Sequence, residues 1–320
     1  MENYLRDAGW IANTATAASI TRAGEGNMNL VLRVALEDRS FILKQSRPWC
    51  EKYPHIPAPE RRILVEAAFY RAVSGIPAVA GMMPRLMAVD EANRVIQMED
   101  LGEGADFTSL YDDGGHGLAL LPELCRWLAA LHSAGFPTPV REGLVNMDMR
   151  RLNHEYLYEL PLLEENGLKL DRITPGLQDA ANQLKAKKSY VRRIAELGDL
   201  YLRNGPRLLH GDYFPGSWLR HSGGVRIIDP EFCFFGPAEY DAGVFIGHLL
   251  LAQRPLAFAG SMFEHYKPSF AFDRSLAWQY AGMEIMRRLI GVGQLPMSAP
   301  ITVKRQLLRL SERLVLEPET

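Results

Sequence analysis

The 320-residue sequence has few of the features that mark secreted, membrane-bound or nucleic-acid-binding proteins. Its three cysteines, Cys50, Cys125 and Cys233, are too few and too far apart for a disulfide framework or a zinc site. No apolar run reaches membrane-spanning length, and residues 1–19 lack the continuous apolar core of a signal peptide. The sequence has 36 basic and 38 acidic residues, and its net charge of −2 creates no strong attraction to nucleic acid or an anionic membrane. We therefore expect a cytoplasmic protein whose partner is a small molecule.

The composition is that of a globular protein. With 47% hydrophobic and 23% charged residues, the chain is long enough for one large domain or two lobes. Residues 19–45 show the order strand, glycine-containing loop, strand, polar turn and strand, with clear period-two alternation at residues 30–35. Residues 61–74 have the pattern of a helix, and residues 85–98 have that of two further strands.

The pattern changes after Leu101, where glycines crowd a loose connector that reaches residue 117. A short β insert is expected at residues 207–229. Around it, apolar residues recur every three or four positions, as in amphipathic helices, at residues 120–132, 154–163 and 177–203. We predict an α+β protein of two lobes: a small antiparallel sheet with one helix at residues 1–101, and a larger, mainly helical lobe at residues 102–320.

Three carboxylates follow the strands of the expected β insert. Asp212 ends the first apolar strand and Asp229 ends the second. One such aspartate commonly only begins a turn, but two at the ends of adjacent strands favour a site. Glu231 stands two positions beyond Asp229 and would point to the same side if the backbone is extended. Such a pair of carboxylates suits Mg²⁺, which completes its octahedron with phosphate and water oxygens.

A glycine loop separates the first two predicted strands. Gly24 and Gly26-Asn27 would allow backbone N–H groups to approach an anionic ligand closely. The same residues would also serve an ordinary hairpin turn, so the loop alone does not decide between the two interpretations.

Lys44 and Glu66 form a second candidate pair. Lys44 lies in the middle of a predicted strand, opposite the side of Phe41 and Leu43. Glu66 shares one helix face with Tyr70, so that an acid appears where the packing face is expected. Lys44 is its natural counter-ion, and this pair would hold the ammonium group against phosphate oxygens.

Together, these groups occur in the order of the kinase scaffold. The sequence resembles the aminoglycoside phosphotransferase and choline kinase superfamily, and within it the 5-methylthioribose kinase family. The narrower resemblance is carried by residues 26–31, 42–45, 98–101, 228–237 and 281–291.

The resemblance implies a two-lobed protein-kinase-like fold and a kinase that uses ATP with Mg²⁺. Asp229 and Glu231 become the metal ligands. The other nucleotide contacts that it implies are a phosphate-binding lysine, its glutamate partner, a glycine loop and a hinge facing adenine, at Lys44, Glu66, Gly24, Gly26, Asn27 and Glu99 to Leu101.

On the acceptor side, the resemblance makes Asp212 the catalytic base and Ser217 a neighbouring substrate residue. It also implies that Arg287 and Arg288 reach the acceptor, although a solvated basic patch is the alternative for at least one of them. Phe232 to Phe235 would then form an apolar wall for a methylthio group.

The acceptor itself stays open. Residues 213–215, between Asp212 and Gly216, depart from the Leu-His-Thr expected of methylthioribose kinases. An aminoglycoside, an amino alcohol or another sugar therefore competes with methylthioribose and methionine salvage. A catalytically silent nucleotide-binding module is a further alternative, and a homodimer is compatible with all of them. His132 and His154 lack acid or cysteine partners at ligand spacing, and we predict structural roles for both.

Overall fold

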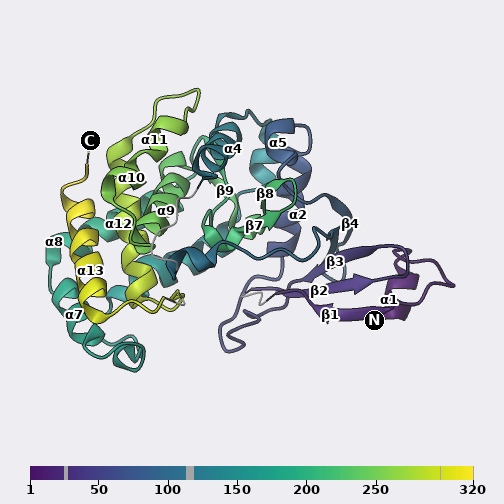
Figure 1. Ribbon diagram of the computed structural model, residues 1–320, viewed down its shortest axis with the longest axis horizontal. Helices are drawn as coiled ribbons and strands as arrows, with labels where there is room; N and C mark the ends of the chain where they lie inside the picture. The colour runs from purple at the N-terminus through teal and green to yellow at the C-terminus, as the bar shows by residue number, and fades with distance from the viewer. Residues whose placement is uncertain (25–27, 113–118, 296, 320) are drawn as a thin grey trace.

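The computed structural model describes residues 1–24, 28–112, 119–295 and 297–319. A small sheet lies at one end of the molecule and a larger group of helices at the other (Figure 1). The sheet is antiparallel, with the strand order β1-β2-β3-β5-β4. Its strands are β1 Ser19–Arg22, β2 Leu30–Ala35, β3 Ser40–Gln45, β4 Leu86–Asp90 and β5 Val95–Glu99.

The two faces of this sheet pack against different parts of the chain. On one face, Leu5 of the short helix α1 (Glu2–Asp7) packs with Ile11 against Val34, Phe41 and Leu43 of the strands. The period-two pattern places these strand residues on one side, so that Lys44 points to the other side. Lys44 therefore faces the interior between the sheet and the rest of the chain, where it is 9% exposed.

Helix α2 (Arg62–Val73) is the long helix predicted before residue 101, and it joins the two ends of the molecule. Its buried Ile63, Phe69 and Tyr70 belong to the same hydrophobic cluster as the helical lobe. Two short helices were not predicted in this region, α1 and α3 (Pro77–Ala80).

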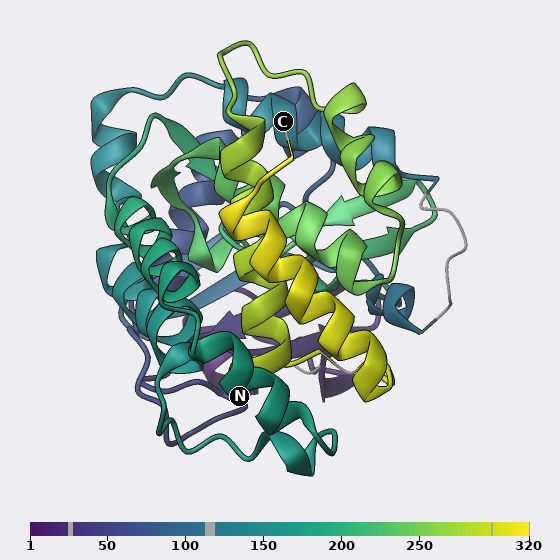
Figure 2. The same cartoon turned by 90° about the vertical axis from the view of Figure 1, so that its left-hand side faces the viewer.

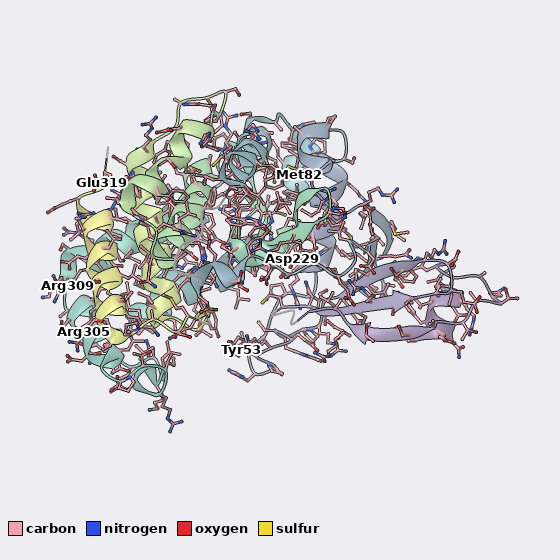
Figure 3. The ribbon with its side chains drawn as sticks, viewed as in Figure 1. Tyr53, Met82, Asp229, Arg305, Arg309 and Glu319 are labelled. Atoms are coloured by element: carbon pink, nitrogen blue, oxygen red, sulfur yellow. The ribbon has the colours of Figure 1, made fainter. Side chains whose placement is uncertain are left out.

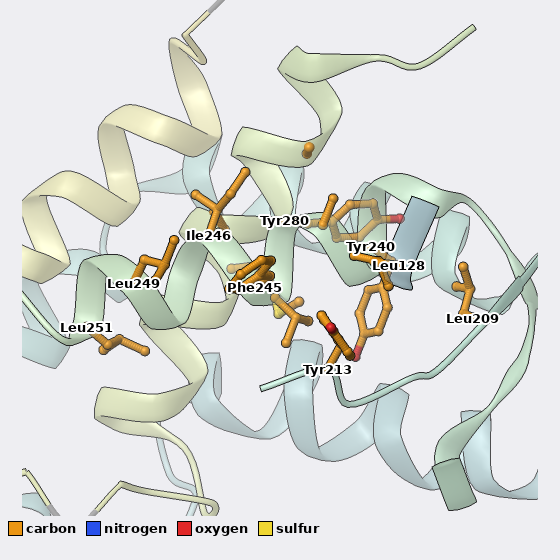
Figure 4. Packing of buried hydrophobic residues seen from close by; sticks show 14 of the residues in the cluster. Leu128, Leu209, Tyr213, Tyr240, Phe245, Ile246, Leu249, Leu251 and Tyr280 are labelled. Carbon is orange, nitrogen blue, oxygen red and sulfur yellow. The ribbon is translucent and has the colours of Figure 1, made fainter. Parts of the chain in front are cut away.

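The rest of the chain is mainly helical, as predicted. Its centre is the packing of α9 (Ala238–Leu251) against α12 (Arg274–Ile290), where Tyr213, Tyr240, Phe245 and Tyr280 meet (Figure 4). Helix α13 (Ile301–Leu316) lies over α12 on the side away from the sheet (Figure 2). The helices are α4 Leu121–Ser133, α5 Thr138–Gly143, α6 Met147–His154, α7 Leu177–Lys185, α8 Lys188–Leu202, α9 Ala238–Leu251, α10 Leu256–Gly260, α11 Met262–His265, α12 Arg274–Ile290 and α13 Ile301–Leu316.

Short turns complete this lobe. A π-helical turn, η2 (Glu155–Glu159), continues α6. The 3₁₀ turns are η1 Thr108–Tyr111, η3 Leu160–Leu162, η4 Leu170–Arg172, η5 Pro215–Ser217 and η6 Pro230–Phe232. Among the described residues, no helix is both long and apolar enough to cross a lipid bilayer.

The pairing expected within the β insert was wrong. Strand β6 (Arg207–Leu209) pairs with β9 (Phe234–Gly236), and β7 (Trp218–His221) pairs with β8 (Gly224–Ile227). The two strands that precede Asp212 and Asp229 therefore do not pair with each other. A local hairpin through Gly223-Gly224 closes a much shorter loop than a direct pairing of β6 with β8 would, and closure of a short loop costs less entropy.

Candidate active site

A cavity of about 570 Å³ lies between the sheet and the β insert. Val31, Ile42 and Met98 supply apolar parts of its wall, while Lys44 and Asp229 supply charge. Asp229 lies at the junction of the sheet and the helical lobe (Figure 3). The cavity wall thus has an apolar part and a charged part. Such a wall suits a ligand that has an apolar group and a charged group.

Lys44 lies between two carboxylates in the cavity wall. Its Nζ is 2.7 Å from Glu66 Oε1 and also donates to Asp229 Oδ1. Burial alone would lower the pKa of Lys44, but Asp229 and Glu66 hold this pKa well above its ordinary value. The predicted Lys44–Glu66 pair is therefore confirmed, and its ammonium group is charged.

Glu231 occupies a different environment from Asp229. Asn29 Nδ2 donates to Glu231 Oε2 at 2.9 Å, and Arg62 Nε lies 3.8 Å from the same oxygen. Burial and the neighbouring carboxylates of Glu66 and Asp229 raise the pKa of Glu231 to about 8, against the opposing effect of Lys44 and Arg62. Glu231 is therefore a much weaker acid than an exposed glutamate.

The backbone between Asp229 and Glu231 is not extended. Asp229 has a left-handed conformation with φ 62°, and Pro230–Phe232 forms the 3₁₀ turn η6. The expectation that both carboxylates share a side because of an extended chain was therefore wrong. Proline fixes its own φ in the helical range, which favours a turn at this position. Among the described residues, no group of three or more His, Cys, Asp or Glu side chains is arranged to hold a metal ion.

A buried aspartate holds the segment that carries Asp212. Asp241 of α9 accepts hydrogen bonds from the backbone nitrogens of His210 at 2.7 Å and Gly211 at 3.0 Å. Ser217 Oγ donates to the Asp212 carbonyl oxygen at 2.9 Å, which closes the following turn. Ser217 thus supports the backbone at Asp212.

The contacts of Asp241 also correct the description of His132. His132 Nε2 lies 3.1 Å from Asp241 Oδ2, and its Nδ1 lies 2.7 Å from the Tyr266 hydroxyl. His132 is structural, as predicted, but it has an acid partner. Sequence spacing could not reveal that partner because α4 and α9 are far apart along the chain. An acid within the apolar sequence of α9 was the available signal for Asp241.

Both arginines near the end of α12 reach Asp212. Nη2 of Arg287 and Nη2 of Arg288 lie 3.3 Å and 3.2 Å from Asp212 Oδ1. Their Nε groups both bind Glu284, one turn earlier on the same helix. The two residues are 9% and 8% exposed, so the alternative of a solvated basic patch is wrong.

Only some of the other residues that were predicted to contact the nucleotide can be placed at the cavity. Gly24, Glu99 and Leu101 line the cavity, although the Glu99 carboxylate itself accepts from Arg85. Gly26 and Asn27 lie outside the described residues.

The expected apolar wall at Phe232 to Phe235 was wrong for the last two of its three phenylalanines. Phe234 is buried against Tyr201, and Phe235 is packed against Phe136, so that both are core residues of strand β9. The aromatic ring next to the arginine pair is instead that of Phe214, whose centroid lies 4.6 Å from the Arg288 guanidinium.

Arg62 is a site residue that sequence reasoning missed. Its guanidinium is fully buried and donates to the Asn29 side chain as well as to the backbone carbonyl groups of Met28, Arg47, Trp49 and Pro59. It therefore ties the chain after the glycine loop to the loop after β3 and to Glu231. Its partners are mostly carbonyl groups, which every residue carries, so no sequence signal could have identified them.

The chain is similar to several kinases of known sequence. A methylthioribose kinase from Exiguobacterium sibiricum is 25% identical over 78% of this chain and 65% of its own length. Methylthioribose kinase 1 from Oryza sativa is 26% identical, over 76% of this chain and 58% of its own length. A methylthioribose kinase from a Geobacillus species is 24% identical over 95% of this chain and 88% of its own length. The chain thus spans less than two thirds of the first two relatives.

Solved structures confirm the two-lobed kinase-like fold. An AMP-bound spectinomycin phosphotransferase has a TM-score of 0.58 at 14% identity, covering 99% of both chains. A choline/ethanolamine kinase family protein from Mesorhizobium loti has a TM-score of 0.56 at 16% identity, covering 99% of this chain and 95% of its own. At such low identity the likeness concerns the fold alone. Residues 19–278 match the family described as Phosphotransferase enzyme family (APH), and the chain belongs to that family.

Proposed function

We propose that this protein is an ATP-dependent kinase of a small metabolite, and that its acceptor is the anomeric hydroxyl of 5-methylthioribose. The observation that carries the proposal is the charged Lys44 between Glu66 and Asp229 in the wall of the cavity. A cation held in place beside an apolar wall suits a nucleotide, because the base needs apolar contacts and the phosphates need positive charge. Val31, Ile42 and Met98 would contact the base.

The residues around Lys44 also fit a divalent cation. Asp229 lines the cavity with its side chain 39% exposed, and a carboxylate oxygen is a ligand that Mg²⁺ accepts. Among the described residues, three carboxylates (Glu66, Asp229, Glu231) face two cations (Lys44, Arg62), and Glu66 Oε2 is buried without a hydrogen-bond partner. An added cation would favour the ionised form of Glu231, whose pKa is raised to about 8 in its absence. We propose Asp229 as the principal ligand of Mg²⁺ and Glu231 as a second one, and the ion would neutralise phosphate charge.

Asp212 is the proposed base for the acceptor hydroxyl. Its carboxylate is 20% exposed, and its backbone is held by Ser217 and by the Asp241 contacts of its neighbours. General bases of this kind contribute about 10²–10⁴-fold to the rate. Arg287 and Arg288 lie at the same carboxylate, and guanidinium groups there would stabilise negative charge on the transferring phosphoryl group.

The charges beside Asp212 favour an uncharged acceptor. A cationic acceptor such as an aminoglycoside or choline would have to bind next to the outer edges of two guanidinium groups, while the second carboxylate that pairs with them, Glu284, is buried behind them. A sugar with an apolar substituent avoids this repulsion and could use the Phe214 ring as an apolar contact. Methylthioribose has this character, which supports it over the amino-containing alternatives.

The cellular context is part of the proposal. All three cysteines are buried and free, as is usual in a reducing compartment, and we propose the cytoplasm as the location. A homodimer stays a prediction that light scattering of the purified protein would decide.

The test is an ATP-consumption assay with methylthioribose, ribose, choline, homoserine and kanamycin as separate acceptors. We expect the highest kcat/KM with methylthioribose. Preference for choline or kanamycin would contradict the proposed acceptor but not the chemistry. Nucleotide binding without transfer to any of a wide range of acceptors would contradict the kinase and support a silent nucleotide-binding module.

A further inference from the structure

Glu284 binds the two arginines at their inner edges. Arg287 Nε lies 2.5 Å from Glu284 Oε2, and Arg288 Nε lies 2.9 Å from Glu284 Oε1. The outer Nη2 groups of both arginines are thereby left for Asp212 Oδ1. One fully buried carboxylate thus determines the direction of two guanidinium groups whose Cα positions differ by about 100° around the helix.

The charge of Glu284 is well defined. Burial alone would raise its pKa, but the guanidinium groups of Arg287 and Arg288 hold this pKa well below its ordinary range. Without this negative charge, two buried cations would lie side by side with only Asp212 to balance them. The carboxylate is therefore needed to keep both arginines directed at one oxygen atom.

Glu284 has one more partner, which continues the network away from Asp212. His248 Nε2 lies 2.7 Å from Glu284 Oε1, and His248 Nδ1 lies 2.6 Å from the Tyr111 hydroxyl. An ionised carboxylate can only accept, so Nε2 must carry a proton. Burial lowers the pKa of His248 to about 4, so the ring is neutral near pH 7. Its Nδ1 must then accept, and the donor is the Tyr111 hydroxyl.

We propose that Tyr111, His248 and Glu284 are positioning residues for phosphoryl transfer. The Glu284 carboxylate fixes the tautomer of His248, and Tyr111 donates to His248 Nδ1 and so holds the ring in place. His248 orients Glu284, and Glu284 directs Arg287 and Arg288 at Asp212. This inference rests on the proposed kinase function. The residues come from three segments that are distant in sequence, η1, α9 and α12. The hydrogen-bond network ends at the carboxylate of Asp212, which would accept the proton of the acceptor hydroxyl.

Tyr111→Phe tests the network with the smallest change. It removes only the hydroxyl that donates to His248 Nδ1, so this buried nitrogen loses its donor and the ring loses the contact that fixes its orientation towards Glu284. We expect kcat to fall several-fold while the KM for ATP stays unchanged. Glu284→Gln should lower kcat by about 100-fold, the size of loss that a displacement of about 1 Å can cause.

Tyr190→Phe is the matched control. Tyr190 is also fully buried, and its hydroxyl bonds Ser311 Oγ at 2.7 Å, which in turn donates to the Gly282 backbone carbonyl of α12 and not to a side chain of the network. It should lower the melting temperature about as much as Tyr111→Phe but leave kcat unchanged. Equal kcat in Tyr111→Phe and wild type, or equal kcat losses in the two tyrosine variants, would overturn the proposal.

A measurement without substrate separates this inference from the proposed function. The ¹⁵N chemical shifts of the His248 ring distinguish the two neutral tautomers. We expect a proton on Nε2 in the wild-type protein and in Tyr111→Phe, and in the variant a ¹⁵N shift of Nδ1 that shows the loss of its hydrogen-bond donor. A wild-type ring protonated on Nδ1 would overturn the network even in an active kinase. If the expected tautomers are found but no acceptor is phosphorylated, the proposed function fails while the arrangement stands.

Discussion

Glu231 links protonation to stability at the scale of a single residue. Its pKa rises from an ordinary 4.5 to about 8 in the folded protein. Between these values the folded chain binds a proton that the unfolded chain releases, so the free energy of unfolding falls as pH rises, by up to about 1.4 kcal/mol per pH unit. Glutamine resembles the protonated form. We predict that Glu231→Gln matches wild type near pH 5 and is more stable above pH 8.

Thermal melting from pH 5 to pH 9 in the presence of a chelator would measure this difference. Glu155→Gln is the control, because it removes the same charge from an exposed glutamate. A stability difference between Glu231→Gln and wild type that does not grow with pH would contradict the raised pKa.

Residues could be predicted from sequence where their type conflicts with their surroundings. Glu66 stood out because an acid on a packing face needs a partner, and Lys44 was the nearest one. The convergence of Arg287 and Arg288 on Asp212 depended instead on Glu284, which looks like any helix glutamate in the sequence. Glu284 differs from an ordinary helix glutamate because it is buried, and burial depends on the whole fold.

The loop after β6 depends on glycine at the scale of an element. Gly211 has φ 89°, and an added Cβ would lie 2.2 Å from the carbonyl oxygen of Phe232. Strain at such a φ costs about 1–3 kcal/mol, and the overlap adds to it. We predict that Gly211→Ala lowers the free energy of unfolding by more than about 2 kcal/mol and moves Asp212, with a loss of activity.

Gly143→Ala is the matched control for this substitution. Gly143 is exposed at the end of α5, with no atom within 4 Å of an added Cβ and no positive φ. Alanine there should be neutral or stabilise the protein by up to about 1 kcal/mol. Denaturant unfolding of both variants compares them directly, and equal effects would contradict the close approach of the loop to Phe232.

Elements were predictable where periodicity is local. The strands of the sheet, α2 and α4 follow from alternation and from three- and four-residue spacing. The stripe at residues 177–203 is two helices, α7 and α8, because the chain leaves the helical conformation at Lys187. The β insert was mispaired because the choice of strand partner depends on loops and on β9, which has only three residues.

Arg62 joins distant segments at the scale of the whole molecule. Together with Glu231, its partners connect the sheet, the loop after β3 and the β insert. Lysine has three N–H donors on one nitrogen, so it cannot reproduce the five N–H donors of the planar guanidinium group. Each buried group left without a partner costs about 1–3 kcal/mol. We predict that Arg62→Lys loses more than about 3 kcal/mol and raises the KM for ATP.

Arg126→Lys is the control, because Arg126 is exposed on α4. Denaturant unfolding and ATP titration would be measured on both variants. If Arg62→Lys stayed within about 1 kcal/mol of wild type, Arg62 would not be the connection between these segments.

The boundary between the lobes at residues 101 and 102 stays a prediction. The hydrophobic cluster that contains Ile63 and Phe69 of α2 continues without a break into α4 and β8. A second contact lies at the loop after β3, which carries Tyr53 (labelled in Figure 3). Tyr53 and Ile56 pack in one cluster with Tyr156 and Val292 of the helical lobe. The composition of the sequence shows where the strands end and the helices begin, but it does not show how tightly the two lobes pack against each other.

Phosphoryl transfer at Asp212 is the central claim, and ³¹P NMR of the reaction product tests it most directly. The protein would be incubated with ATP, Mg²⁺ and methylthioribose, beside Asp212→Asn at equal concentration. We predict a new sugar phosphate signal coupled to the anomeric proton in the wild-type reaction, formed about 10²–10⁴-fold more slowly by Asp212→Asn, which still binds ATP. A wild-type protein that forms no sugar phosphate, or an Asp212→Asn variant that forms it at nearly the wild-type rate, would contradict this account.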